Sequence, residues 1–167
     1  WIPFHTVRGQ LCYTKATDAT EKVRTNICYG GYCTPGNDGW HSIGSTFQPW
    51  LSDTIASEED NRAIIENFEN KLPLLQGEMK AYDARAALRV SAKDRFPVIG
   101  AVPGYEQLYI SAGHGSHGLT SSVTGAEIIA AQLTGDVIPV PVSVLAELSA
   151  QRFIDRDARK SKASLDR

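Results

Sequence analysis

Residues Gly113–Gly118 read Gly-His-Gly-Ser-His-Gly, a GxGxxG spacing that lies between two regular patterns. An apolar run at Gln107–Ser111 predicts a strand before this loop, and the stretch Ser121–Leu133 predicts a helix after it. Gly135 is the expected C-cap of the helix, because glycine adopts the left-handed backbone conformation without strain. The sequence therefore predicts a strand, a glycine loop and a helix in direct succession.

Three interpretations of the glycine loop remain open from its spacing alone. A dinucleotide fingerprint would place a pyrophosphate at the helix N-terminus, but it requires a second parallel strand after the helix. The segment Val137–Pro141 follows instead, and its two prolines exclude a central strand. The second interpretation is a structural turn without a ligand. In the third, the loop N–H groups face another electron-rich group, such as the N1/C2=O edge of a reduced flavin, with His114 and His117 lining the pocket.

The first ninety residues predict one mostly antiparallel sheet with a packing helix. Runs rich in β-branched and aromatic residues are typical of strands, and they occur at Val7–Thr14, Lys22–Tyr29, Gly30–Thr34, Trp40–Thr46 and Tyr82–Ser91. A turn is indicated at Pro35–Gly39. Ser57 is a candidate N-cap before three acidic residues, and apolar residues at helical spacing follow until Pro73 ends the helix.

The second half continues with shorter elements. A turn at Lys93–Pro97 precedes a short apolar strand at Val98–Val102, and Ser143–Leu148 predicts a short helix. From Arg152 onward, six cations accompany three aspartates. This basic tail is consistent either with a solvated terminus or with a segment that contacts phosphates.

Bulk composition excludes several classes of protein. The 167 residues are 42% hydrophobic and 22% charged, with a net charge of −2, so no global field attracts nucleic acid. No apolar run is long enough to cross a bilayer. The opening Trp1–Phe4 lacks an initiator Met and the features of a signal peptide, as expected for a piece of a longer chain.

The three cysteines, Cys12, Cys28 and Cys33, suit a reducing cytoplasm better than a disulfide framework. Their spacing lacks a CxxC, and no histidine pair lies nearby, so we expect no metal site. We expect all three to be buried as small apolar side chains.

The stretch Ala87–Gly100, ALRVSAKDRFPVIG, resembles the closing segment of the D-amino-acid oxidase superfamily. In that superfamily an arginine-bearing strand, a D-x-x-P-x-x-G turn and a glycine-rich loop before a helix return the chain to the flavin domain. The resemblance implies an α+β fold, with a mostly antiparallel substrate-domain sheet and packing helix at 1–91. The C-terminal strand-loop-helix part of an FAD-binding domain is then expected at 92–150, and the basic tail at 151–167.

Finer matches are similar to the oxidoreductase half of the bifunctional bacterial enzymes that modify the wobble uridine of tRNA. They cover nearly the whole chain in order: Val7–Gln10, Gly31–Pro35, Ile43–Thr46, Gly115–Thr120 and Gln151–Phe153. This resemblance implies FAD as cofactor, held mainly by residues outside this stretch, and tRNA as substrate. It also implies cytoplasmic location and a fused upstream methyltransferase domain that uses S-adenosylmethionine.

The resemblance also implies roles for individual residues. Arg89 matches the carboxylate-binding arginine of glycine-oxidase-like members, although a structural ion pair is its alternative role. Arg85, four residues earlier, could substitute for it because both would share a strand face. The cofactor contacts are expected from the loop and the first helical turn, namely Gly113, Gly115, Ser116, His117, Gly118, Leu119 and Thr120. His117 stands where the family commonly has arginine. Asp94 and Arg95 are expected to build a turn.

Three functions compete at this point. The first is an FAD-dependent oxidase that removes the carboxymethyl group from carboxymethylaminomethyl-uridine in tRNA. The second is an oxidase of free glycine, sarcosine or D-amino acids, and the third is a non-enzymatic binding module of the same fold. The cations of the tail and the finer matches favour the first over the second.

Overall fold

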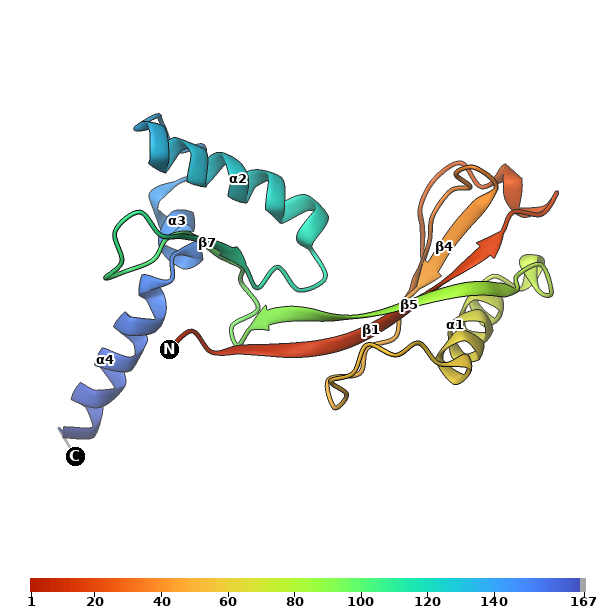
Figure 1. Ribbon diagram of the computed structural model, residues 1–167, viewed down its shortest axis with the longest axis horizontal. Coiled ribbons are helices and arrows are strands. Elements are labelled where there is room, and N and C mark those ends of the chain that lie inside the picture. The colour runs from red at the N-terminus through yellow and green to blue at the C-terminus, as the bar shows by residue number, and fades with distance from the viewer. Residues whose placement is uncertain (166–167) are drawn as a thin grey trace. The chain divides into compact units, whose positions relative to one another are not determined.

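A computed structural model describes residues 1–165, with side chains described as far as residue 162. The chain forms two compact units. One, the sheet unit, comprises Val7–Leu88, and the other, the loop unit, comprises Trp1–Thr6 together with the residues from Arg89 onward. The mixed helices and strands, shown in Figure 1, confirm the expected α+β class.

The sheet unit is built on a five-stranded sheet with the order β2-β3-β4-β1-β5. Its strands are β1 (Phe4–Lys15), β2 (Ile27–Cys28), β3 (Tyr32–Cys33), β4 (Trp40–Gly44) and β5 (Ala81–Ala92). β1 and β4 pair antiparallel, in a register that runs from Leu11 opposite Gly44 to Lys15 opposite Trp40. β3 is antiparallel to both β2 and β4, so the prediction of a mostly antiparallel sheet is confirmed.

Helix α1 (Glu58–Lys71) covers part of this sheet and packs against β4 (Figure 1). The Ser57 hydroxyl accepts a hydrogen bond from the Asp60 N–H at 3.1 Å, which confirms Ser57 as the N-cap. Ile64 and Phe68 of α1 are buried against Cys12 and Ile43 of the sheet. The helix ends before the 3₁₀ turn η2 (Pro73–Leu75), as the proline predicts.

The predicted strand at Lys22–Tyr29 is mostly wrong. Within that range only the two residues of β2 form a strand, and the 3₁₀ turn η1 (Thr20–Lys22) lies before β2 and overlaps only the first residue of the range. The Thr17 N–H donates to the Thr20 hydroxyl at 2.9 Å, and the Thr20 N–H donates to the Thr17 hydroxyl at 3.3 Å. Such local side-chain bonds compete with strand pairing, and residue propensity does not reveal them.

The loop unit contains a two-stranded antiparallel sheet of β6 (Val98–Ala101) and β7 (Tyr109–Ala112). The helix α2 (Gly118–Thr134) follows, three residues longer at its start than predicted, and Gly135 caps it with a φ of 76°. No strand follows α2 within residues 1–165. The GxGxxG loop therefore follows an antiparallel pair and does not open a βαβ unit.

Two further helices follow, α3 (Val142–Leu148) and α4 (Gln151–Leu165). Ala92, Val98, Ala150 and Phe153 form a small core in this unit. The expectation of a solvated tail is therefore wrong for the first turns of α4, since Arg152 and Phe153 are buried. The last two residues of that tail lie outside the described part of the chain.

The cysteines only partly follow the expectation. Cys12 and Cys33 are buried, and burial raises the pKa of each thiol to about 11, so neither is a reactive thiolate at neutral pH. Cys28 is exposed, because its two-residue strand lies at the edge of the sheet. Within the described residues no group of three or more His, Cys, Asp or Glu could hold a metal ion. Over the same residues, no helix combines the length and the apolar character needed to cross a membrane.

Candidate functional site

The glycine loop makes two turns that only glycine accommodates well. Gly113 and Gly115 have φ values of 71° and 57°, in the left-handed region. A Cβ atom on Gly113 would lie 2.9 Å from Cε1 of Phe4, and one on Gly115 would lie 3.2 Å from the Ser91 Oγ. The loop therefore packs tightly on neighbouring chain and has no room for a side chain at Gly113.

The end of β5 lies directly beside this loop. The Gly115 N–H donates to the Val90 carbonyl at 3.0 Å, and Ser91 forms an isolated antiparallel bridge with His114. Residues two apart on a strand share a face, so Arg89 lies on the same face of β5 as Ser91, whose hydroxyl approaches Gly115. The structure thus brings the strand end that carries the half-buried Arg89 together with the glycine loop.

The two loop histidines have different surroundings. The His114 ring is bonded on both sides, through Nδ1 to the Ser121 Oγ at 2.8 Å and through Nε2 to the Ser111 Oγ at 3.0 Å. It therefore ties the end of β7 to the first turn of α2. His117 is exposed at the N-cap position, and its side chain makes no capping hydrogen bond.

The first turn of α2 presents both backbone and side-chain groups at the surface. The His117 carbonyl accepts bonds from the N–H groups of Thr120 and Ser121, at 3.1 and 3.0 Å. The earlier N–H groups of a helix have no carbonyl four residues back, so those of Gly118 and Leu119 can face a ligand. Leu119 is 96% exposed, so this turn has an uncovered apolar side chain beside its donors.

Comparison with known proteins identifies the family of this chain. The model of the family described as DAO, FAD dependent oxidoreductase, matches residues 2–132. This chain belongs to that family.

Curated relatives agree with the assignment. The chain is 30% identical over 186 residues to the tRNA 5-methylaminomethyl-2-thiouridine biosynthesis bifunctional protein MnmC of Leptospira interrogans, a match that covers 95% of the chain and 29% of the relative. The protein of the same name from Idiomarina loihiensis is 31% identical over 153 residues, covering 91% and 25%. The chain therefore spans well under half the length of the relatives it matches.

Solved structures show the same fold. The glycine oxidase of Geobacillus kaustophilus superimposes with a TM-score of 0.74 at 21% identity, covering 89% of this chain and 39% of that one. The iminodiacetate oxidase of Chelativorans sp. BNC1 gives a TM-score of 0.77 at 19% identity, with coverages of 89% and 40%. The L-proline dehydrogenase of P. horikoshii gives 0.75 at 20%, with coverages of 93% and 41%.

The loop of this DAO-family chain fits an electron-rich edge of FAD. Gly113 and Gly115, both in the left-handed region, let the loop pack against Phe4 and Ser91 and lead the chain into the N-terminus of α2, where the first N–H groups can face a ligand. The hydroxyls of Thr120 and Ser121 are both bonded to the His117 carbonyl, at 3.0 and 2.8 Å, so they stabilise the turn. Hydrogen-bond donors at the N-terminus of a helix, the positive end of its dipole, stabilise an oxygen or nitrogen atom that gains negative charge.

The two arginines predicted for substrate binding do not lie in the same unit. Arg89 begins the second segment of the loop unit, whereas Arg85 belongs to the sheet unit. Arg85 is exposed and Arg89 is half-buried, although both lie on β5. Only Arg89 is therefore placed by the structure in the unit that contains the glycine loop.

Asp94 is a structural residue of the turn after β5. It accepts two bonds from Arg152, at 2.8 and 3.1 Å, and one from the Phe96 N–H at 3.2 Å, and Arg156 also binds it. Burial on its own would raise its pKa, but the bonds from the two arginines outweigh burial and lower the pKa to about 2. This network agrees with the predicted turn-building role of Asp94.

A buried network around Arg8 was not anticipated. Arg8 is 2% exposed, and its guanidinium binds the Asp60 carboxylate at 2.7 Å, Gln10 at 3.2 Å, Gln48 and the Ile55 carbonyl. Its Nε atom lies 3.3 Å from Asp53 but without hydrogen-bond geometry. The network fastens the segment 48–55 and the first turn of α1 to β1. A cation inside a strand-like stretch was the one signal available in the sequence.

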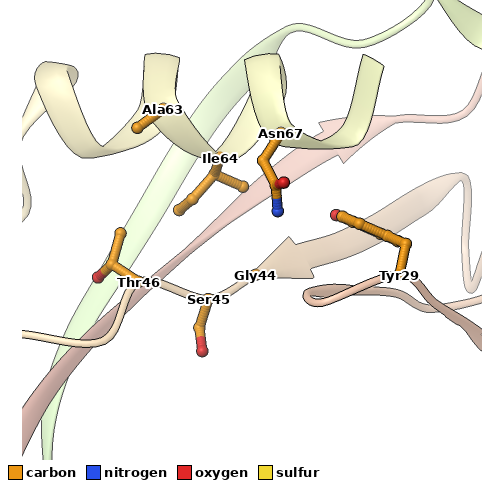
Figure 2. A pocket seen from close by; sticks show the side chains of 7 residues that line it. All are labelled: Tyr29, Gly44, Ser45, Thr46, Ala63, Ile64 and Asn67. Atoms are coloured by element: carbon orange, nitrogen blue, oxygen red, sulfur yellow. The ribbon is translucent and has the colours of Figure 1, made fainter. Parts of the chain in front are cut away.

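A pocket of about 200 Å³ lies in the sheet unit, between α1 and the end of β4 (Figure 2). Figure 2 shows Ile64 and Asn67 pointing from α1 toward this space, with Tyr29 opposite and Ser45 turned away. Burial raises the pKa of Tyr29 above its ordinary value, so its hydroxyl stays protonated at neutral pH. None of the described residues that line this pocket is charged, whereas the strand end beside the glycine loop carries an arginine.

Proposed function

We propose that the chain is the C-terminal part of an FAD-dependent oxidoreductase that removes the carboxymethyl group from carboxymethylaminomethyl-uridine at the wobble position of tRNA. The adjacency of the Arg89-bearing strand end and the glycine loop carries this proposal. The names of the 30%-identical relatives support the choice of tRNA as substrate. The word bifunctional in those names supports a second activity, and we propose that it is a fused upstream methyltransferase that uses S-adenosylmethionine in the cytoplasm.

The chemistry is the oxidation of a carbon next to a secondary amine. When bound, FAD accepts the hydride from that carbon. Water then adds to the resulting imine and the C–N bond breaks. The carboxymethyl group leaves as glyoxylate, and an aminomethyl group stays on the uridine. For this chain we propose that the N–H groups at Gly118 and Leu119 stabilise negative charge on the cofactor, with Gly113, Gly115, Ser116, His117 and Thr120 completing the contact.

Arg89 is the proposed substrate anchor. The substrate carries a carboxylate one carbon from its reactive amine, and a guanidinium can hold that carboxylate with two parallel hydrogen bonds. Such a fork fixes the direction of the reacting C–H bond, and small misplacements are costly for transfer to a fixed acceptor. Arg85 is the proposed secondary contact. Asp94 has no part in this chemistry, because two arginines already bind its carboxylate.

The roles of three successive segments of the chain are also a proposal. Residues 1–91 would contribute to substrate binding, 92–150 would form the C-terminal part of the FAD-binding domain, and 151–167 would form a basic end segment.

The product distinguishes this function from an oxidase of free amino acids. We expect the full-length protein to convert tRNA that carries carboxymethylaminomethyl-uridine into tRNA with the aminomethyl form, detected by mass spectrometry of digested nucleosides. Free glycine and sarcosine serve as the competing substrates, assayed by peroxide or glyoxylate release. Turnover of glycine with unchanged nucleosides would contradict the proposal and favour a small-molecule oxidase.

A further inference from the structure

A local excess of positive charge lies on α4 and on the turn that packs against it. The whole chain has a net charge of −2. Between residues 151 and 162, α4 carries two carboxylates against five cations, which are Arg152, Arg156, Arg159, Lys160 and Lys162. Lys93 and Arg95 add two exposed cations on the turn before β6. Such an excess on an otherwise acidic chain is typical of a surface that contacts a polyanion.

The first turns of α4 are firmly anchored, so the later cations are held at fixed positions. The buried Arg152 donates two bonds to Asp94, at 2.8 and 3.1 Å, and others to the carbonyls of Leu148 and Phe96, both at 3.0 Å. Phe153 is buried beside it, with the Arg152 Cζ 4.2 Å from the ring centre. Buried ion pairs with several hydrogen bonds fix geometry, whatever their net contribution to stability.

The cations beyond this anchor are available to a partner. Arg159, Lys160 and Lys162 are exposed. The only salt bridge of Lys160 among the described side chains is with Asp157 at 3.8 Å, and the two side chains are 80% and 74% exposed. An ion pair that is so open to solvent contributes little, so Lys160 can exchange Asp157 for another anion. Positions 156, 159 and 160 are neighbours on one helix face.

A hollow of about 270 Å³ lies next to these residues within the same unit. Lys93, Arg156 and Lys160 line it together with the rings of Trp1 and Phe153. Two carboxylates also line it: Asp94, which Arg152 already binds, and Asp157, which forms the open pair with Lys160. Cations beside an exposed aromatic ring provide phosphate contacts and a stacking surface, which is the combination used for nucleic-acid strands.

We propose that Lys93, Arg159, Lys160 and Lys162 bind the phosphate backbone of the tRNA substrate. This inference rests on the proposed function, since it concerns the same tRNA substrate. It assigns the phosphate backbone of that tRNA to a surface that takes no part in the oxidation. A basic helix can also lie on anionic lipid, but then it needs an apolar face directed at the membrane. The large apolar residue Phe153 of α4 is buried, which leaves Ile154 as the single exposed large apolar side chain between residues 151 and 162.

Fluorescence anisotropy with the full-length FAD-loaded protein and labelled tRNA tests this directly. The variant Arg159→Gln/Lys160→Gln/Lys162→Gln is compared with wild type over a series of salt concentrations. Each lost phosphate contact reduces the slope of log K against log salt by roughly 0.7–0.9, so we expect a slope smaller by about 2 and an affinity about tenfold weaker at low salt. The flavin spectrum and the melting temperature should stay unchanged, because none of the three residues is buried.

A matched control removes equal charge from the sheet unit. Lys22→Gln/Arg24→Gln/Lys71→Gln neutralises three exposed cations there and should leave the salt slope unchanged. Wild-type affinity and slope in the α4 variant would overturn the inference while leaving the proposed function intact, and so would an equal loss in the control. Failure of wild type to bind tRNA at all would overturn both. Binding of wild type to phosphatidylserine vesicles, lost in the α4 variant while tRNA binding persists, would assign the surface to lipid instead.

Discussion

Variants of Arg89 distinguish a substrate-binding role of this residue from a structural one. We expect Arg89→Ala to lower kcat/KM on modified tRNA. The expected loss of transition-state stabilisation is about 2–4 kcal/mol, as is typical when one partner of a desolvated charge pair is truncated. Arg89→Lys should lose less, because the charge remains and only the two-bond geometry disappears. The measurements are steady-state kinetics and the melting temperature of the same variants, with Arg62→Ala at an exposed position of α1 as control.

These two measurements separate the roles of Arg89. A substrate anchor predicts reduced kcat/KM with an unchanged flavin spectrum and an unchanged melting temperature. A structural ion pair predicts the reverse, a lower melting temperature with nearly normal kcat/KM in the protein that remains folded.

Asp94 makes a pH-dependent contribution to stability. Its pKa falls from 3.8 to about 2 on folding, so the unfolded chain binds the proton more readily. The stabilisation is therefore fully present above about pH 4 and is lost as the pH falls through 2. A shift of about two units corresponds to about 2–3 kcal/mol. We expect Asp94→Asn to lower the melting temperature at pH 7 and to flatten its decline in acid, whereas the exposed Asp18→Asn should do neither.

The contacts of single side chains were the least predictable feature of the sequence. The pairing of Asp94 with Arg152 joins positions 58 apart, and the bond from Arg8 to Asp60 joins positions 52 apart. No local pattern reports which distant polar side chains meet inside a core. The turn role of Asp94 was predictable because its bond to the Phe96 N–H is local.

Among the elements, those with both a cap and a stop signal were predicted well. α1 has Ser57 at its start and Pro73 beyond its end, so local chemistry fixed both boundaries. α2 has only its stop signal, Gly135, and its uncapped start lies three residues before the predicted one. The strand predicted at Lys22–Tyr29 is reduced to the two residues of β2, and the paired hydroxyls of Thr17 and Thr20 fix a turn directly before that range. The helix α4 was missed altogether, because its anchor is the distant Asp94 and the sequence predicted only a basic tail.

The glycine loop allows a prediction about two alanine variants. Gly113→Ala combines a left-handed φ with a Cβ at 2.9 Å from the Phe4 ring, whereas Gly135→Ala has a φ of 76° and no atom within 4 Å. The left-handed conformation costs an alanine about 1–2 kcal/mol in both. We expect Gly113→Ala to be the more destabilising in thermal unfolding and also to alter the flavin absorption spectrum. Equal melting temperatures and an unchanged spectrum would show that the loop is not closely packed beside the cofactor.

At the scale of the whole molecule, the chain spans 29% of the length of its relative from Leptospira interrogans. Its GxGxxG loop follows the antiparallel β6–β7 pair, so it lacks the βαβ setting in which a dinucleotide's pyrophosphate is bound. Most of the affinity for a dinucleotide comes from such contacts. We therefore expect the isolated 167-residue chain to bind FAD weakly or not at all in isothermal titration calorimetry, and full-length protein to retain it. Stoichiometric FAD in the purified isolated chain would refute this expectation.

The central claim is that the full-length protein oxidises the carboxymethylaminomethyl arm of tRNA through its flavin, and anaerobic reduction of that flavin tests it most directly. On mixing with tRNA that carries the modified uridine, the account predicts loss of the oxidised-flavin absorbance and release of one glyoxylate per flavin reduced. Unmodified tRNA is the control and should leave the spectrum unchanged. An oxidised spectrum that persists with the modified tRNA but bleaches with free glycine or sarcosine would contradict the claim.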